Sequence, residues 1–248
     1  MSIPILSVRV NTTSYAATSE LVIGWARSFE SRFVCIANVH MLMEVFDSPI
    51  YKQVINSADL VTPDGVPLVW LLRMKGQKDQ QRVYGPTLML HLLEAAAREH
   101  VPVGFYGSSP QVLESLIKRM QARYERLNVA FSYSPPFRAM NPEEDAESIN
   151  QINQSGARIL FVGLGCPNQE IWMAEHRGKV NPVMLGVGAA FDFLAGLKPQ
   201  APAWMQKIGL EWFYRLLSEP RRLWKRYLYH NPRFVVLAIA DLFGLIKD

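Results

Sequence analysis

In the stretch VPVGFYGSSPQVLESLIKRMQARYERL, residues 101–127, an apolar run passes directly into a helical pattern. Residues 101–107 are almost continuously apolar, which is typical of a strand covered on both faces. Ser109 and Pro110 fit the N-cap and the first turn of a helix. Apolar residues then recur every three or four positions, as on the buried side of a helix. A buried strand followed by such a helix predicts one unit of a parallel sheet.

The same pattern recurs along most of the chain. A second helical pattern covers residues 86–100, and further strand-like runs occupy residues 33–39, 59–64, 129–134, 158–165 and 183–188. This alternation predicts an α/β fold, with a Rossmann-like, mostly parallel sheet and helices on both faces. We expect residues 1–196 to form this α/β core.

After about residue 196 the pattern becomes purely helical. Three pieces follow, at residues 201–217, 220–230 and 232–246. Pro202, Pro220 and Pro232 punctuate them, and proline interrupts helices because it lacks an N–H donor. We therefore expect residues 197–248 to form an all-helical C-terminal appendage.

The composition of the chain bears on the cellular compartment in which the protein is expected. The 248 residues are 49% hydrophobic and 19% charged, with a formal net charge of +4. No run of 18 apolar residues predicts a membrane-spanning helix, and the longest candidate, residues 234–246, contains Asp241. The isolated cysteines Cys35 and Cys166 suit a reducing compartment. Since no basic segment precedes an apolar run at the N-terminus, we expect a cytoplasmic protein.

Three glycine-containing turns follow predicted strands, in GFYGSSPQ, GLGCPNQE and GVGAAFDF. A helix that opens after such a turn offers backbone N–H groups and a partial positive charge to a phosphate. One such turn can serve backbone geometry alone, but three at the ends of neighbouring parallel strands favour a nucleotide or diphosphate site. The candidate binding residues are Gly107, Ser108, Gly163, Gly165, Pro167 and Gly188. A nicotinamide enzyme is disfavoured, because Asn168 occupies the position of the third glycine of the dinucleotide fingerprint.

Polar residues near the predicted strand ends are the candidates for chemistry. Asp64, in TPDG, either caps a turn or presents a carboxylate that takes a proton from a hydroxyl. Asn38 and Gln169 suit either ligand contact or hydrogen bonding in the core. Asp192 lies among apolar residues, where it either contacts a ligand or pairs with an arginine such as Arg82 or with backbone amides.

No metal site is expected from the sequence. The five histidines show no ligand spacing, the two cysteines stand alone, and no Asp-x-Asp motif follows a strand.

Residues 215–232, RLLSEPRRLWKRYLYHNP, combine five cations with leucine and aromatic side chains. The cations are Arg215, Arg221, Arg222, Lys225 and Arg226. Because arginine matches phosphate oxygens with paired hydrogen bonds, the cluster indicates a partner that is anionic and partly apolar. The alternative is structural: the aromatic residues pack the appendage while the cations are solvated.

Together these fragments resemble the WecG/TagA/CpsF glycosyltransferases (glycosyltransferase family 26) over roughly residues 30–235. The most specific matches are VGLGCPNQEIWMAEHR (162–177), GVGAAFDFLAG (186–196) and APAWMQKIGLEWFYRLLSEPRRLWKRYLYHNP (201–232). VCIANVHML and RVYGPTLML look closest to exopolysaccharide members of the xanthan type.

The resemblance implies an inverting transfer of a sugar from a UDP-sugar to a polyprenyl-diphosphate-linked saccharide in bacterial surface-polysaccharide assembly. The donor would be UDP-glucose, UDP-N-acetylmannosamine or its uronate, with no obligatory metal or other cofactor. Asp64 looks like the general base, and Asn38 and Gln169 like polar contacts to the reacting sugars. Arg215, Arg221, Arg222 or Arg226 would hold the diphosphate of UDP or of the acceptor.

The resemblance also implies a place at the membrane. The appendage would hold the enzyme on the inner face of the cell membrane, with Trp204, Trp212, Trp224 and residues 234–246 in the headgroup region and the cations drawn to anionic lipid.

Two departures from the family pattern keep other functions open. Many members have Thr just before the Asn of the first motif and an Asp where this chain has Thr87, whereas here Ile36 and Ala37 precede Asn38. A non-catalytic scaffold is therefore one alternative. Nucleic-acid binding through the basic cluster is another, but we do not expect it, because the cations sit in one patch and the net charge is modest. A homo-oligomer is compatible with the sequence, which does not fix the oligomeric state.

Overall fold

A computed structural model describes residues 1–246 of the chain. The strands of this part are β1 (Ser2–Ile5), β2 (Val8–Asn11), β3 (Phe33–Ala37), β4 (Leu60–Pro63), β5 (Val103–Gly107), β6 (Val129–Tyr133), β7 (Ile159–Gly163) and β8 (Val183–Gly186). Its helices are α1 (Tyr15–Arg27), α2 (Val39–Asp47), α3 (Pro49–Asn56), α4 (Val66–Met74), α5 (Gly85–Arg98), α6 (Pro110–Arg123), α7 (Pro142–Gln154), α8 (Asn168–His176), α9 (Ala190–Leu194), α10 (Ala203–Lys207), α11 (Glu211–Ser218) and α12 (Pro220–Leu242).

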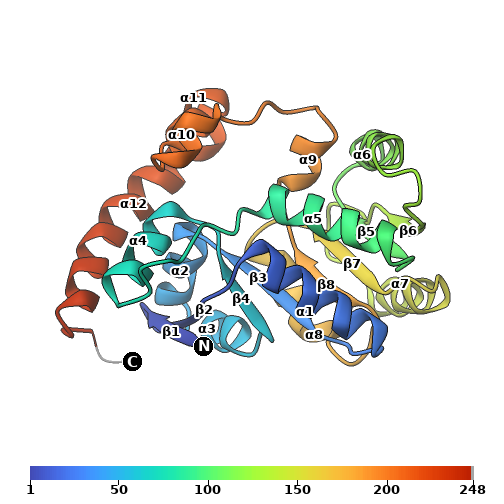
Figure 1. Ribbon diagram of the computed structural model, residues 1–248, viewed down its shortest axis with the longest axis horizontal. Coiled ribbons are helices and arrows are strands. Elements are labelled where there is room, and N and C mark those ends of the chain that lie inside the picture. Colours follow the sequence, from blue (N-terminus) through green and yellow to red (C-terminus); the bar gives the residue numbers. More distant parts are fainter. Residues whose placement is uncertain (247–248) are drawn as a thin grey trace. The chain divides into compact units, whose positions relative to one another are not determined.

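Strands β3 to β8 form a six-stranded sheet in the order β4-β3-β8-β7-β5-β6. β7 pairs in parallel with both β5 and β8, and Gly107 at the end of β5 lies opposite Gly163 at the end of β7. β5 and β8 are buried along their whole length, as their continuous apolar runs predict, whereas the edge strand β6 is mostly half-buried. Helices flank the sheet (Figure 1), so the predicted α/β, Rossmann-like class is confirmed.

The chain divides into two compact units. The first unit contains residues 1–14, residues 36–84 and the chain from Pro199 onward, and the second contains residues 15–35 and 85–198. The C-terminal helices therefore share a compact unit with β4 and with the hairpin of β1 and β2. The functional division between residues 1–196 and 197–248 stays a prediction, and the last two residues of that appendage lie outside the described residues.

In the first unit, β1 and β2 form an antiparallel hairpin that the sequence pattern did not predict. Leu6 and Ser7 form its two-residue turn, and both have positive φ, at 47° and 66°. Turns of this kind usually contain Asn or Gly. Here the Leu6 side chain is fully buried, so its burial stabilises a backbone conformation that leucine rarely adopts. Asn11, at the end of the hairpin, accepts a hydrogen bond from the backbone N–H of Val61 in β4 at 2.8 Å.

The C-terminal helices also differ from the prediction. The first predicted piece is two helices, because α10 ends before Gly209, which has φ +79°, a conformation that suits glycine after a helix. The predicted break at Pro232 is wrong, since this proline lies inside α12. α12 lies alongside α2 and α4 (Figure 1), and it buries Tyr227 before the proline and Phe234 after it. This packing on both sides outweighs the cost of a proline in a helix, about 3 kcal/mol.

Within residues 1–246, no helix has both the length and the apolar character that crossing a membrane requires.

Candidate active site

Asp64 and Asn38 lie together in the first unit, where β3 and β4 end. The backbone N–H groups of Asp64 and Gly65 both donate to the carbonyl oxygen of Ala37, the last residue of β3, at 2.9 and 3.2 Å. Asn38 follows directly and is the N-cap of α2, with its side-chain oxygen accepting from the N–H of Met41 at 3.2 Å. The N-cap of α4 is Gly65, so the Asp64 side chain does not cap that helix.

Asp64 shares a guanidinium with a second carboxylate. The Nη2 of Arg82 lies 2.9 Å from Oδ1 of Asp64 and 2.7 Å from Oε2 of Glu211, a residue of α11. Arg82 also donates through Nε to the Asp64 carboxylate, at 3.1 Å, and to its backbone carbonyl. The ring of Tyr84 lies 4.1 Å from the guanidinium carbon. The three charged side chains are 13–19% exposed, so the cluster is largely shielded from water.

Burial governs the titration of this cluster. Burial, together with the negative charge of Glu211, raises the pKa of Asp64 to about 6, although the positive charges of Arg82 and Arg215 act in the opposite direction. Burial alone would lower the pKa of Arg82, but the two carboxylates outweigh it, and Arg82 stays charged. A carboxylate that titrates near pH 6 is ionised at neutral pH and can still accept a proton, which suits a general base.

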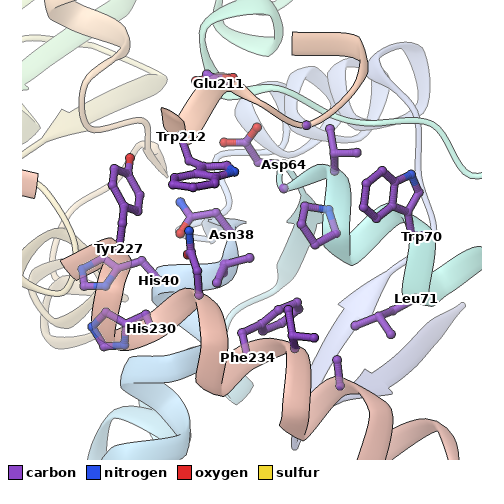
Figure 2. Close-up of a pocket in the computed structure, with 18 of the residues that line it drawn as sticks. Asn38, His40, Asp64, Trp70, Leu71, Glu211, Trp212, Tyr227, His230 and Phe234 are labelled. Atoms are coloured by element: carbon purple, nitrogen blue, oxygen red, sulfur yellow. The ribbon is translucent and has the colours of Figure 1, made fainter. Parts of the chain in front are cut away.

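Asp64 opens onto a cavity of about 480 Å³ within the first unit (Figure 2). One part of its wall is polar and charged, formed by Asn38, His40, Asp64, Arg82, Glu211, Arg215, Arg226, His230 and Asn231. The rest is apolar and belongs mainly to α4 and α12, with Trp70, Leu71 and Phe234 among its members (Figure 2). A binding site with both kinds of wall suits a ligand that is itself part ionic and part apolar.

The four arginines predicted to bind a diphosphate fall into two classes. Arg215 of α11 and Arg226 of α12 line the cavity, and the positive charge of Arg215 helps to lower the pKa of Asp64. Arg221 and Arg222 are exposed at the start of α12 and are outside the cavity lining, and Arg222 pairs with Glu219 at 2.6 Å. The first pair therefore faces the cavity, and the second faces solvent.

At the polar wall of the cavity, the lining residues His40 and His230 and the adjacent Glu44 bring their ligand atoms within 4.8 Å of one another. Oε1 of Glu44 is 3.5 Å from Nδ1 of His40 and 3.5 Å from Nε2 of His230. Burial, with the nearby Arg226, lowers the pKa of His40 to about 3, so this ring is neutral, the form that binds metals. These are the side chains within residues 1–246 that could hold a metal ion, although the charge of Arg226 opposes a second cation there.

The remaining predicted residues belong to the second unit, where backbone geometry dominates. Gly107 has φ +116°, and a side-chain carbon there would lie 2.7 Å from the backbone of Gly163. A side-chain carbon on Gly163 would in turn lie 2.6 Å from the ring of Phe191. Ser108 has φ +61°, and its carbonyl accepts from the hydroxyl of Ser134 at 2.6 Å. These glycines are therefore required by the close approach of β5, β7 and α9.

Gln169 lies at the centre of the other two glycine turns. It is 5% exposed, its Oε1 accepts from the N–H of Gly165 at 3.2 Å, and its Nε2 donates to Glu170 at 2.7 Å. A side-chain carbon on Gly188 would lie 3.4 Å from the same Oε1. Pro167, which joins the turn to α8, follows a cis peptide bond. Gln169 thus has the core role that the sequence left open, and it lies beside two of the predicted binding glycines.

Asp192, on α9, has a lysine partner. Its carboxylate lies 3.8 Å from Nζ of Lys198, and its backbone carbonyl accepts from the N–H groups of Leu197 and Lys198. The arginine named as its candidate partner, Arg82, is engaged with Asp64 and Glu211 instead.

Sequence reasoning assigned no role to Glu211 or to the group of His40, Glu44 and His230. Glu211 stands in the Leu-Glu-Trp motif that carried the family resemblance, but nothing near it in sequence indicated a guanidinium partner 129 residues away. His40 and Glu44 have the spacing of one helical turn, which is a weak signal alone. His230 joins them from α12, so the group is visible only in the fold.

Comparison with known proteins finds similar chains. A sequence profile described as the Glycosyl transferase WecG/TagA/CpsF family matches residues 3–247. An N-acetylglucosaminyldiphosphoundecaprenol N-acetyl-beta-D-mannosaminyltransferase from Bacillus spizizenii is 32% identical over 208 residues, covering 84% of this chain and 78% of that protein. A protein of the same name from Bacillus subtilis (strain 168) is 30% identical over 192 residues, covering 77% and 72%.

Proposed function

Since the chain belongs to the WecG/TagA/CpsF family of glycosyl transferases and is a glycosyltransferase, we propose that it transfers a sugar from a UDP-sugar to a saccharide linked to a polyprenyl diphosphate. The two Bacillus relatives are named for an acceptor of this kind and for the transfer of N-acetylmannosamine. UDP-N-acetylmannosamine is therefore the first donor to test, with its uronate and UDP-glucose as the other two.

The observation that carries this proposal is the buried carboxylate of Asp64 beside a cavity lined by two arginines. Burial and Glu211 bring the pKa of Asp64 close to the working pH, and the guanidinium of Arg82 fixes its position. Arg215 and Arg226 line the same cavity, so a diphosphate bound there would meet two cations.

In the proposed reaction, Asp64 takes the proton of the attacking acceptor hydroxyl. The hydroxyl oxygen forms a bond to the anomeric carbon of the donor from the face opposite UDP, and the bond from that carbon to the UDP oxygen breaks. The bonding electrons leave with UDP, and the configuration inverts. General-base assistance of this kind is worth about 10²–10⁴ in rate.

Negative charge develops on the leaving diphosphate, and Arg215 and Arg226 are cations of this cavity that would bind either that diphosphate or the diphosphate of the acceptor. Asn38 supplies a polar contact at the same wall. The roles of Gln169 and of the glycine turns of the second unit as polar contacts to a substrate stay predictions that rest on the family resemblance. No step of this mechanism requires a metal ion.

We further propose that the enzyme works on the cytoplasmic face of the cell membrane. Large apolar side chains of α10, α11 and α12 are exposed, and these include Trp204, Phe213, Leu217, Trp224 and Leu228. Arg221, Arg222 and Lys225 are exposed on the same segment. A surface that combines such residues suits an anionic membrane interface.

The decisive experiment offers the purified protein each UDP-sugar together with a prenyl-diphosphate-linked N-acetylglucosamine and measures the release of UDP. Release that needs both substrates is the expected result. Release of UDP without acceptor, or none with any donor, would contradict the proposal. Liposome flotation beside an electrophoretic mobility shift with nucleic acid separates a membrane surface from a polynucleotide as the partner of α12.

A further inference from the structure

The cavity at Asp64 continues as an apolar groove between α4 and α12, and we propose that this groove binds the first isoprenoid units of the acceptor. The inference rests on the proposed function, because it assigns the lipid part of that acceptor to a place in the same site. It concerns the hydrocarbon chain rather than the sugars or the diphosphate.

Two helical stripes form the groove. On α4 the lining residues are Val66, Pro67, Trp70, Leu71 and Met74, and on α12 they are Phe234, Val235, Ala238, Ile239 and Leu242. Each set recurs at three- or four-residue intervals, so each occupies one face of its helix. Trp70 and Leu71 lie on the side of the cavity opposite His230, and Phe234 lies on α12 one turn beyond His230 (Figure 2).

The apolar faces of the two helices bury each other only in part, since Leu71 and Phe234 are buried but other lining residues are not. Trp70 is 49% exposed, Val235 is 55% exposed and Ile239 is 51% exposed, although all three line one cavity. Apolar faces that pack directly lose most of their exposed surface, because the removal of apolar surface from water is favourable. A hydrocarbon ligand in the groove would complete this burial.

The distribution of charge selects the class of hydrocarbon. At the polar end, Arg215 and Arg226 line the cavity beside Asp64, whereas the walls between α4 and α12 carry no charged lining residue within residues 1–246. Near the C-terminal end of α4, Lys75 pairs with Asp241 of α12 at 2.7 Å and ties the two helices together. Cations at one end and an apolar channel beyond them match a diphosphate ester of a long hydrocarbon chain, rather than a fatty acid or a neutral lipid.

The groove predicts that binding tightens with the number of isoprene units. Isothermal titration calorimetry with inorganic pyrophosphate, geranyl diphosphate and farnesyl diphosphate, below their critical micelle concentrations, measures this directly. One further isoprene unit has five carbon atoms, and even partial burial of them gives at least about tenfold tighter binding. Equal affinity for the three diphosphates would overturn the proposal.

Two neighbouring valines of α12 provide a matched pair of variants. Val235 lines the groove, whereas Val236 is 67% exposed and is not part of the lining. Val235→Trp is expected to fill the groove and abolish the dependence on chain length, and Val236→Trp is expected to keep it. If both variants lost the dependence of affinity on chain length, or if both kept it, the groove would not be the binding site of the prenyl chain. A groove covered by a second copy of the chain would instead show chain-length-independent binding and a dimer that Val235→Trp dissociates.

Transfer assays separate this inference from the proposed function. With acceptors of increasing prenyl length, the groove predicts a falling KM in the unmodified protein and a constant KM in Val235→Trp. Transfer with the same KM for all lengths would refute the groove and leave the function standing. Chain-length-dependent binding without any transfer would refute the function and leave the groove standing.

Discussion

The two units of this protein hold their candidate site residues by different means. In the first unit, the site consists of charged side chains that meet from segments far apart in sequence, with Arg82 between Asp64 and Glu211. In the second unit, it consists mainly of backbone at strand ends, where Gly107 and Gly163 leave no room for a side chain. The candidate residues of the first unit thus form a cluster of titratable charges, and those of the second unit form close backbone contacts.

This difference predicts different consequences of mutation. A change of charge in the first unit should alter the reaction while the fold persists. If one carboxylate of the buried cluster is neutralised, Arg82 still pairs with the other carboxylate. A change of volume in the second unit should alter stability, because the contacts there are backbone atoms that cannot move aside. The comparison would be mistaken if changes of charge in the first unit altered stability and changes of volume in the second unit altered only the reaction.

The largest effect is expected for Asp64→Asn. The amide keeps the size of the side chain but cannot accept the proton, so the transfer rate should fall by about 10²–10⁴. Arg82 retains Glu211 as a carboxylate partner, so the fold should persist. Initial rates of UDP release and far-UV circular dichroism measure the two quantities.

Asp79→Asn is the matched control for this variant, because Asp79 is an exposed aspartate of the first unit outside the cavity lining. Its rate should equal that of the unmodified protein. Full activity of Asp64→Asn would remove Asp64 from the role of general base.

The next effect concerns stability in the second unit. Gly107→Ala places a carbon 2.7 Å from the backbone of Gly163 and requires an alanine at φ +116°. We expect a loss of about 2–4 kcal/mol in the free energy of unfolding, from overpacking and backbone strain. This corresponds to a melting temperature lower by roughly 5–15 °C.

Gly24→Ala is the control for volume alone, since Gly24 lies in α1 and a side-chain carbon there meets nothing within 4 Å. This variant should be as stable as the unmodified protein or more so, by about 0.5–1 kcal/mol. An unchanged melting temperature for Gly107→Ala would show that the backbone at this turn adapts.

The comparison also explains what sequence alone could predict. The central strands of the sheet were predicted because their apolar runs are nearly continuous, and the glycine turns because a required glycine is itself the signal. The position of Asp64 followed from its place after a strand. All of these are local in sequence.

What the sequence did not indicate depends on distant partners. The turn at Leu6 and Ser7 lacks the usual Asn or Gly, and its backbone conformation is held by burial of Leu6 in the fold. Pro232 marks a helix end by its chemistry, but packing on both sides keeps α12 continuous. The link between Arg82 and Glu211 spans 129 residues, so no local pattern could predict it.

A third experiment tests whether the ionisation of Asp64 controls activity. Activity should rise with pH through about 6, because Asp64 acts only in its ionised form and its pKa is raised to about 6. Glu211→Gln removes a charge that raises this pKa, so the acidic limb of the rate profile should move to lower pH. Arg82→Gln removes a charge that lowers it, so the limb should move to higher pH. If both variants moved the acidic limb of the rate profile in the same direction, direct coupling of these two charges to Asp64 would be excluded.

The smallest effect separates two classes of arginine within the first unit. Arg221 and Arg222 are exposed and outside the cavity lining, so Arg221→Gln and Arg222→Gln should each weaken binding to anionic vesicles about fivefold, or about 1 kcal/mol per charge. Arg215→Gln and Arg226→Gln should instead raise the KM for the donor or the acceptor, because these arginines line the cavity.

Vesicle flotation at increasing salt measures the binding to vesicles, and steady-state kinetics in detergent measure the KM. If all four substitutions changed flotation and KM alike, the cavity and the surface that carries Arg221 and Arg222 would be one continuous site, and all four arginines would serve a single ligand.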